Sequence, residues 1–222
     1  MEFISSPWEP PAAYIVRHGE TELNASNCFR GWENPALNDA GLEAAQIIGN
    51  FFSYERIGRL LSSDLDRALQ TAEAILLSGA VQDGYVSPDF NLRPWGIGNF
   101  AGCEKTEKEQ KRLQRYIDNP LEKIPDGESL QDFRDRQEQS LLQYIFSPVD
   151  GLPTVIVTHT SNLTYLAEFV DLQNGEDPSR DPEVHDLVEP GGIVAVFVDT
   201  NGKIKLQPRL GAVEVEAEPQ AS

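Results

Sequence analysis

Short apolar runs alternate along this chain with longer segments of helical periodicity. The apolar runs occupy residues 12–17, 58–63, 153–159 and 191–199, and a weaker run at 85–90 contains Pro88, which favours a sheet edge. The helical segments are 39–52, 64–79, 104–118, 128–146 and 160–170. Strands that alternate with helices predict an α/β fold with a mostly parallel central sheet and helices on both faces.

The same pattern predicts how the chain is organised. Residues 1–11 are rich in proline and indicate a loose N-terminal arm, whereas residues 211–222 indicate an acidic tail. The stretch between them, 12–210, has a length that suits one α/β domain. Near its end, "TNG" at 200–202 predicts a hairpin that joins the strand at 191–199 to a strand at 203–208.

The charge balance limits the partners that we expect. With 36 acidic and 18 basic residues the net charge is -18, which argues against nucleic acid and against anionic membrane surfaces. A small phosphorylated ligand is compatible with this charge, since a pocket can be locally positive. We read no signal peptide and no apolar segment of bilayer length, so we expect a cytoplasmic protein. Nothing in the sequence predicts the oligomeric state.

Polar side chains follow three of the predicted strands at the point where each ends. Arg17 and His18 close the first, Arg67 follows the second by four residues, and His159 follows the strand at 153–159. Ligands in open α/β sheets bind beyond the carboxyl ends of the strands. We therefore expect these four side chains to meet at one rim.

Two histidines and two arginines at one rim suit a dianionic phosphoryl group. The planar arginine fork matches phosphate oxygens in pairs. A neutral imidazole is a competent nucleophile towards phosphorus, and nearby positive charge keeps it neutral by lowering its pKa. Gly19 would let phosphate approach the backbone. Arginines repel cations, so we expect neither a metal nor another cofactor.

Five blocks in order resemble the histidine phosphatase superfamily, also called phosphoglycerate mutase-like. They are "RHGETELN", "LNDAGLEAAQ", "SSDLDRALQTAEAIL", "PDGESLQDFRDR" and "VTHTSNL", and the likeness runs from about residue 12 to residue 198. The resemblance implies a three-layer sandwich with a helical lid at about 103–146, and chemistry that needs no metal. It also implies that His18 is the phosphorylated nucleophile, that Arg17, Arg67 and His159 surround the phosphoryl group, and that Asn24 is a further donor.

One position departs from the family pattern. Many members carry a glutamate in a leucine-arginine-glutamate run as the proton donor to the leaving oxygen, whereas here the run is "LRPWGIGNFAG", with Pro94 in that place. Proton donation contributes about 10²–10⁴-fold to such reactions. Either another carboxyl serves, with Glu128 the first candidate and Glu20 the second, or the substrate has a good leaving group, such as an acyl phosphate, a phosphohistidine or a pyrophosphate.

The favoured function is a phosphatase that acts on a small phosphorylated molecule. A mutase is less favoured, because the chain lacks the arginine-tyrosine-glycine block and the longer insert of the family's mutases. The missing glutamate also allows a relative that binds a phosphorylated ligand without turning it over. For single residues, Arg67 could instead pair with Asp64 or Glu20, and Arg30 and Arg93 could be phosphate contacts or ordinary solvated arginines.

Overall fold

The computed structural model describes residues 10–175 and 189–210. Most of the predicted arm and the whole of the predicted acidic tail lie outside the described residues.

The core of the fold is a six-stranded sheet in the order β3-β2-β4-β1-β5-β6. Its strands are β1 (Ala13–Arg17), β2 (Arg59–Ser63), β3 (Val86–Asp89), β4 (Thr154–Thr158), β5 (Ile193–Val198) and β6 (Ile204–Leu210). Strands β3, β2, β4 and β1 pair in parallel, whereas β5 pairs antiparallel with both β1 and β6. The mostly parallel sheet, the edge position of the Pro88 strand and the C-terminal hairpin are therefore confirmed.

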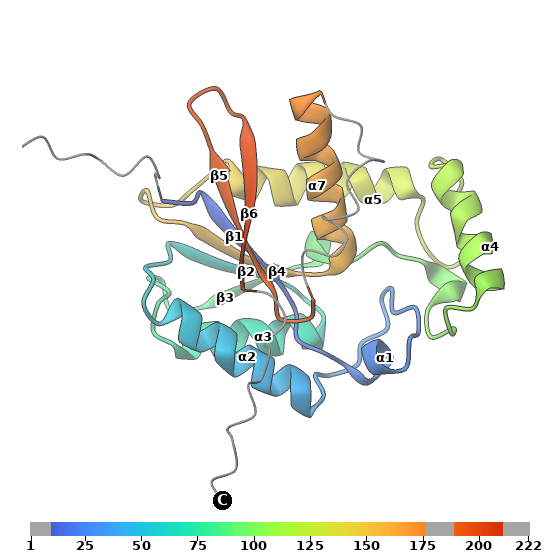
Figure 1. Cartoon of the computed structure of the whole chain (residues 1–222), viewed down its shortest axis with the longest axis horizontal. Helices are drawn as coiled ribbons and strands as arrows, with labels where there is room; N and C mark the ends of the chain where they lie inside the picture. The colour runs from blue at the N-terminus through green and yellow to red at the C-terminus, as the bar shows by residue number, and fades with distance from the viewer. Residues whose placement is uncertain (1–9, 176–188, 211–222) are drawn as a thin grey trace, which may run out of the picture.

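Helices cover both faces of the sheet, as Figure 1 shows. On one face lie α2 (Asp39–Phe52) and α3 (Asp66–Leu77). On the other lie α7 (Thr160–Asn174) and one long helix made of α5 (Leu130–Gln137), a π-helical stretch at Glu138–Leu142 and α6 (Gln143–Ile145). Alternate residues of β1 enter opposite cores: Tyr14 and Val16 pack with α2 and α3, and Ala13 and Ile15 pack with the second layer. This period of two is what a strand buried on both faces requires, and it confirms the three-layer sandwich.

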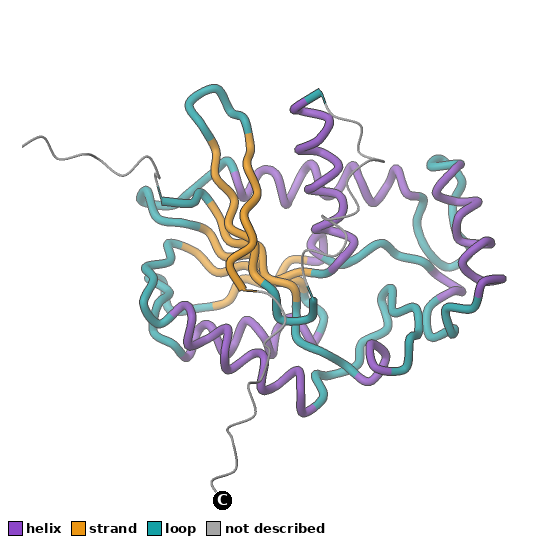
Figure 2. Tube along the Cα trace, in the orientation of Figure 1, coloured by secondary structure: helices purple, strands orange, loops and turns teal. Residues whose placement is uncertain are grey.

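A third apolar cluster lies beyond the ends of the parallel strands. It is built from Trp95, Ile97, Phe100, Ile124, Leu130 and Phe133, with Leu113 and Tyr116 of α4 (Glu107–Asp118) packed against it. Helix α4 stands apart from the sheet, among loops (Figures 1 and 2). The predicted lid at about 103–146 thus shares a small core with residues 95–100, which precede it. Its last part, Leu141–Ile145, packs in the sheet core instead, because the long helix runs from the lid onto the sheet.

The remaining helices are short. They are α1 (Glu22–Ala25) and the 3₁₀ turns η1 (Phe90–Leu92) and η2 (Gly98–Phe100). Among the described residues, no helix has both the length and the apolar character needed to cross a membrane.

Candidate active site

The carboxyl ends of the parallel strands open into a cavity of about 500 Å³. His18 follows β1, Arg67 lies in the first turn of α3, and His159 follows β4; all three line this cavity, together with Pro94. The centroids of the two imidazole rings are 5.0 Å apart. The meeting of the two histidines predicted from their strand ends is therefore confirmed.

His18 is held with one ring nitrogen presented as a base. Its Nδ1 lies 2.6 Å from the carbonyl oxygen of Gly19, which can only accept, so Nδ1 carries the proton. The unprotonated Nε2 accepts a hydrogen bond from Nε of Arg67 at 3.2 Å. Burial, and next the charge of Arg67, hold the pKa of His18 well below its usual value. The ring is thus neutral at physiological pH and has a lone pair on Nε2.

Gly19 serves packing as well as this hydrogen bond. A Cβ at this position would lie 2.4 Å from the carbonyl oxygen of Gly41 in α2, and the Gly19 amide donates to Oγ1 of Thr71 in α3. The close approach that requires glycine here is to helix α2. The approach of phosphate to this part of the backbone stays a prediction.

Arg67 is fully buried and is anchored by backbone oxygens. Its terminal nitrogens donate to the carbonyls of Glu33 at 2.6 Å and Gly31 at 3.2 Å. Burial, and next the charge of Arg30, lower the pKa of Arg67 to about 9. Its ordinary alternative partners are engaged elsewhere: Asp64 pairs with Arg93 at 2.6 Å, and Glu20 accepts from Asn38 at 2.8 Å. Among the described residues, the guanidinium is thus fixed beside His18 with no carboxylate in ion-pair contact, and the charge of Asp66 acts on it less strongly than burial and the neighbouring arginines do.

His159 is buried, and neither of its ring nitrogens has a hydrogen-bond partner among the described residues. The hydroxyl of Thr160, which also lines the cavity, has none either. Burial, and next the charge of Arg67, lower the pKa of His159 well below its usual value. Buried polar groups without partners are rare in proteins. These atoms indicate a place where a ligand supplies the missing partners.

The other two arginines near the site differ in position. Arg17 closes β1 and its charge lowers the pKa of His18, but it is not among the residues that line the cavity. Arg30 lines the cavity, and its charge lowers the pKa of Arg17, Arg67 and both histidines. Arg30 is therefore a site residue that the sequence did not separate from Arg93.

Asn24 does not line the cavity. Its Oδ1 accepts from the amide and the hydroxyl of Thr21, at 3.1 and 2.8 Å, and so fixes the start of the short helix α1. Its contact with phosphate stays a prediction. Glu20, the second candidate for proton donor, is also outside the lining and anchors the loop to the N-cap of α2 through Asn38.

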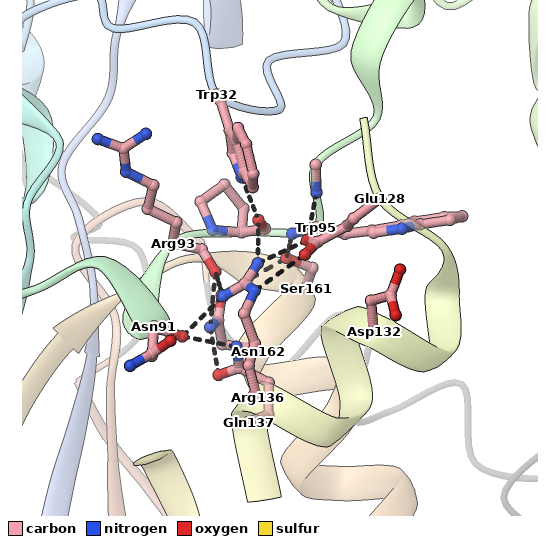
Figure 3. A network of polar contacts seen from close by, with 12 residues as sticks. Trp32, Asn91, Arg93, Trp95, Glu128, Asp132, Arg136, Gln137, Ser161 and Asn162 are labelled. Carbon is pink, nitrogen blue, oxygen red and sulfur yellow. Dashed lines mark hydrogen bonds and ion pairs between the residues drawn. The ribbon is translucent and has the colours of Figure 1, made fainter. Parts of the chain in front are cut away.

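Glu128, the first candidate for proton donor, is placed in a structural network (Figure 3). Its Oε1 accepts from the Gly96 amide at 2.8 Å and from Arg136 at 2.7 Å, and its Oε2 accepts from Arg136 at 3.1 Å. Arg136 also donates to the carbonyls of Asn91, Arg93 and Pro94. Glu128 is not part of the cavity lining. With both oxygens accepting from fixed donors, it suits a buried ion pair and does not suit a proton donor.

The two neutral histidines make stability depend on pH. Unfolding restores a pKa of about 6.5, so below that pH the unfolded chain binds two protons that the folded chain does not. We expect the contribution of the two histidines to the free energy of unfolding to be fully present above pH 6.5. Below pH 6.5 the free energy of unfolding should fall by about 1.4 kcal/mol per pH unit for each histidine. Urea unfolding between pH 7.5 and 5, in buffers without phosphate, measures this slope. In His159→Asn, the slope of the free energy of unfolding against pH should decrease by the contribution of one histidine. An unchanged slope would contradict the assignment of His159 as a buried neutral histidine.

Comparison with known proteins gives the family. A profile of the histidine phosphatase superfamily (branch 1) matches residues 13–179. A 2,3-bisphosphoglycerate-dependent phosphoglycerate mutase from Methylocella silvestris is 32% identical over 167 residues, which is 71% of this chain and 80% of that protein. Phosphoglycerate mutase-like protein 4 from Arabidopsis thaliana is 34% identical over 164 residues, 69% of this chain and 68% of its own length.

Solved structures of other proteins have the same fold as this chain. The α-ribazole phosphatase from Shigella flexneri matches with a TM-score of 0.67 and 20% identity, over 88% of this chain and 94% of that one. At this identity the likeness concerns the fold alone. The profile, however, spans well over half of the sequence, and the chain therefore belongs to the histidine phosphatase superfamily.

Proposed function

We propose that this protein is a metal-independent phosphatase that hydrolyses a small phosphorylated molecule through a phosphohistidine on His18. One observation carries the proposal: Nε2 of His18 is unprotonated and is held by a hydrogen bond from the buried guanidinium of Arg67, opposite the ring of His159, whose nitrogens have no hydrogen-bond partner among the described residues. A neutral nucleophile, fixed positive charge and unpartnered donors around one cavity are the components that phosphoryl transfer needs.

In the first step, Nε2 of His18 attacks phosphorus and forms a P–N bond while the P–O bond to the leaving group breaks and its electron pair stays on the leaving oxygen. Arg67 and Arg30 line the cavity and offset the charge on the equatorial oxygens, and His159 contributes further hydrogen bonds. In the second step, water attacks phosphorus, the P–N bond breaks, and neutral His18 and dihydrogen phosphate are released. The carbonyl of Gly19 keeps the Nδ1 proton in place throughout.

A mutase is the second candidate, because the relatives at 32% and 34% identity carry phosphoglycerate mutase names. In a mutase, the phosphoryl group of the same phosphohistidine would pass to a hydroxyl of the product rather than to water. Incubation with 3-phosphoglycerate separates the two functions, since a mutase forms 2-phosphoglycerate and a phosphatase releases inorganic phosphate.

The covalent intermediate is the direct test. After brief incubation with p-nitrophenyl phosphate and an alkaline quench, mass spectrometry should find phosphate on the peptide that contains His18, and acid should remove it. Phosphate release should continue in EDTA. Protein that binds vanadate but never carries this label would instead be a binding relative without turnover, and the proposal would fail.

A further inference from the structure

The described residues that line the cavity place no carboxylic acid next to the two histidines. Among the described residues that line it, Glu168 is the one with an acidic side chain. Glu168 lies nine residues beyond His159 on α7, about 13 Å along the helix axis, and it pairs with Arg134 at 2.9 Å. Pro94 lines the cavity as well, but its side chain has no ionisable group that could donate a proton. None of the described residues that line the cavity therefore offers a carboxyl beside the leaving oxygen of the phosphoryl group.

The lining of the cavity also carries positive charge. Lys105 lines the cavity with its ammonium 5.8 Å from the centroid of the Phe29 ring, and the charges of Arg30 and Arg17 act on it after burial in lowering its pKa. Fixed cations stabilise an anion as it forms, with no proton transferred. The cavity is thus suited to leaving groups that depart as anions.

The rest of the cavity wall is mostly apolar. The third apolar cluster contributes Trp95, Ile97 and Phe133 to this wall. Helix α7 contributes Tyr165, and α4 contributes Leu113 and Ile117. A volume of about 500 Å³ lies within the range of about 300–1,000 Å³ that drug-sized ligands occupy. A phosphate group on a short polar chain would leave this wall uncovered, whereas an aromatic ring system would bury it.

Taken together, the missing acid and the apolar wall point to one class of substrate, and this inference rests on the proposed function. We infer that the cavity takes phosphate esters of an acidic, phenol-like hydroxyl on a largely apolar aromatic group. The P–O bond then breaks to release an aryloxide, which Lys105 and the arginines stabilise and which takes its proton from solvent after it leaves. His18 holds the phosphoryl group until water releases it.

Phenyl phosphate and benzyl phosphate test the leaving group, because they are similar in size but release a phenol and an alcohol. We expect kcat/KM, which reports the step that forms phosphohistidine, to be roughly 10²–10⁴-fold higher for phenyl phosphate, the range attributed to proton donation. Along a series of substituted phenyl phosphates, kcat/KM should fall steadily as the phenol becomes less acidic.

Pro94→Glu should reduce the difference in kcat/KM between phenyl phosphate and benzyl phosphate. The glutamate supplies a proton donor in the cavity wall, so kcat/KM for benzyl phosphate should rise about tenfold or more. Pro94→Gln is the matched control, because glutamine has nearly the same shape as glutamate but no carboxyl that can transfer a proton, and it should show no gain. Both variants keep the Pro94 carbonyl that accepts from Trp32 and Arg136. If a variant folds poorly, the comparison of phenyl and benzyl phosphate on the wild-type protein still tests whether the cavity prefers a phenol-like leaving group.

The apolar wall is tested on α4, where Ile117 is 42% exposed and lines the cavity. Ile117→Asp should raise KM for 1-naphthyl phosphate by roughly tenfold. Leu121→Asp is the matched control, since Leu121 is 81% exposed and lies outside the lining, and KM should not change. Equal KM values for the two variants would show that the aromatic group does not contact α4, which overturns this part of the inference.

The outcomes separate the inference from the proposed function. Equal kcat/KM for phenyl and benzyl phosphate, with phosphate still found on His18, would overturn the inference and leave the phosphatase standing; Lys105 would then be the proton donor to examine. Failure to turn over any of these esters, with His18 unlabelled, would overturn both.

Discussion

Replacing His18 by alanine is expected to lower kcat/KM for p-nitrophenyl phosphate by roughly 10⁴-fold or more, the scale of loss seen when a covalent nucleophile is removed. The expected loss follows from the geometry of Nε2, which carries the lone pair and lies at the centre of the arginine cluster. Phosphate release in a continuous assay at pH 7 measures it. Thermal unfolding of the variant checks that the buried site still folds.

His159→Ala is the informative companion to this variant. Its ring is equally buried and lies 5.0 Å from His18. In the proposed mechanism it donates a hydrogen bond to the phosphoryl group and does not form the P–N bond. We expect a smaller loss of activity, with phosphate still detectable on His18. If His18→Ala kept more than a tenth of the wild-type activity while His159→Ala kept none, the roles of the two histidines would be reversed.

The two histidines could be predicted from the sequence because their positions follow from strand pairing. β1 and β4 are neighbouring parallel strands, with Arg17 opposite Thr158. The next residue of each strand, His18 or His159, therefore leaves the sheet at the same edge, and parallel pairing brings the two rings together. The position of Arg67 could be predicted in the same way, because β2 pairs with β4 and ends four residues before Arg67.

Arg30 could not be predicted, since it lies in a loop whose path depends on distant backbone groups. The carbonyls of Gly31 and Glu33 accept from Arg67, and this contact brings the loop over the site. A backbone acceptor has no signature in the sequence, so Arg30 could not be distinguished from Arg93, which pairs with Asp64 instead. Loops are positioned by the scaffold rather than by their own periodicity.

For Glu128, the sequence predicted the position but not the contacts that determine its role. The sequence places it just before a helix that starts at the N-cap Ser129, and this position made it a plausible acid at the rim. Its actual role depends on Arg136, two turns further along the same helix, and on the Gly96 amide. The helical pattern of residues 128–146 likewise predicted an apolar face but not that the face contacts the lid at Phe133 and the sheet at Leu141.

Arg136→Met is expected to destabilise the protein by about 3–5 kcal/mol, the cost of leaving a buried charge without its partner. Arg136 and Glu128 are each only 11% exposed in their side chains and lie 2.7 Å apart. The same guanidinium holds the carbonyls of Asn91, Arg93 and Pro94 at 2.6–2.8 Å, so its loss also releases the segment that forms the cavity wall (Figure 3). Urea unfolding at pH 7 measures the change.

Arg134→Met is the matched control, because Arg134 lies on the same helix and pairs with Glu168 at 2.9 Å, with side chains 36% and 32% exposed. A pair this accessible to water contributes about 0–1 kcal/mol. The two substitutions remove the same group from the same helix, so the difference between them isolates burial and the three backbone carbonyls. If both variants lost the same stability, the Arg136 network would be no more than a surface ion pair, and the Pro94 segment would have to be held by other contacts.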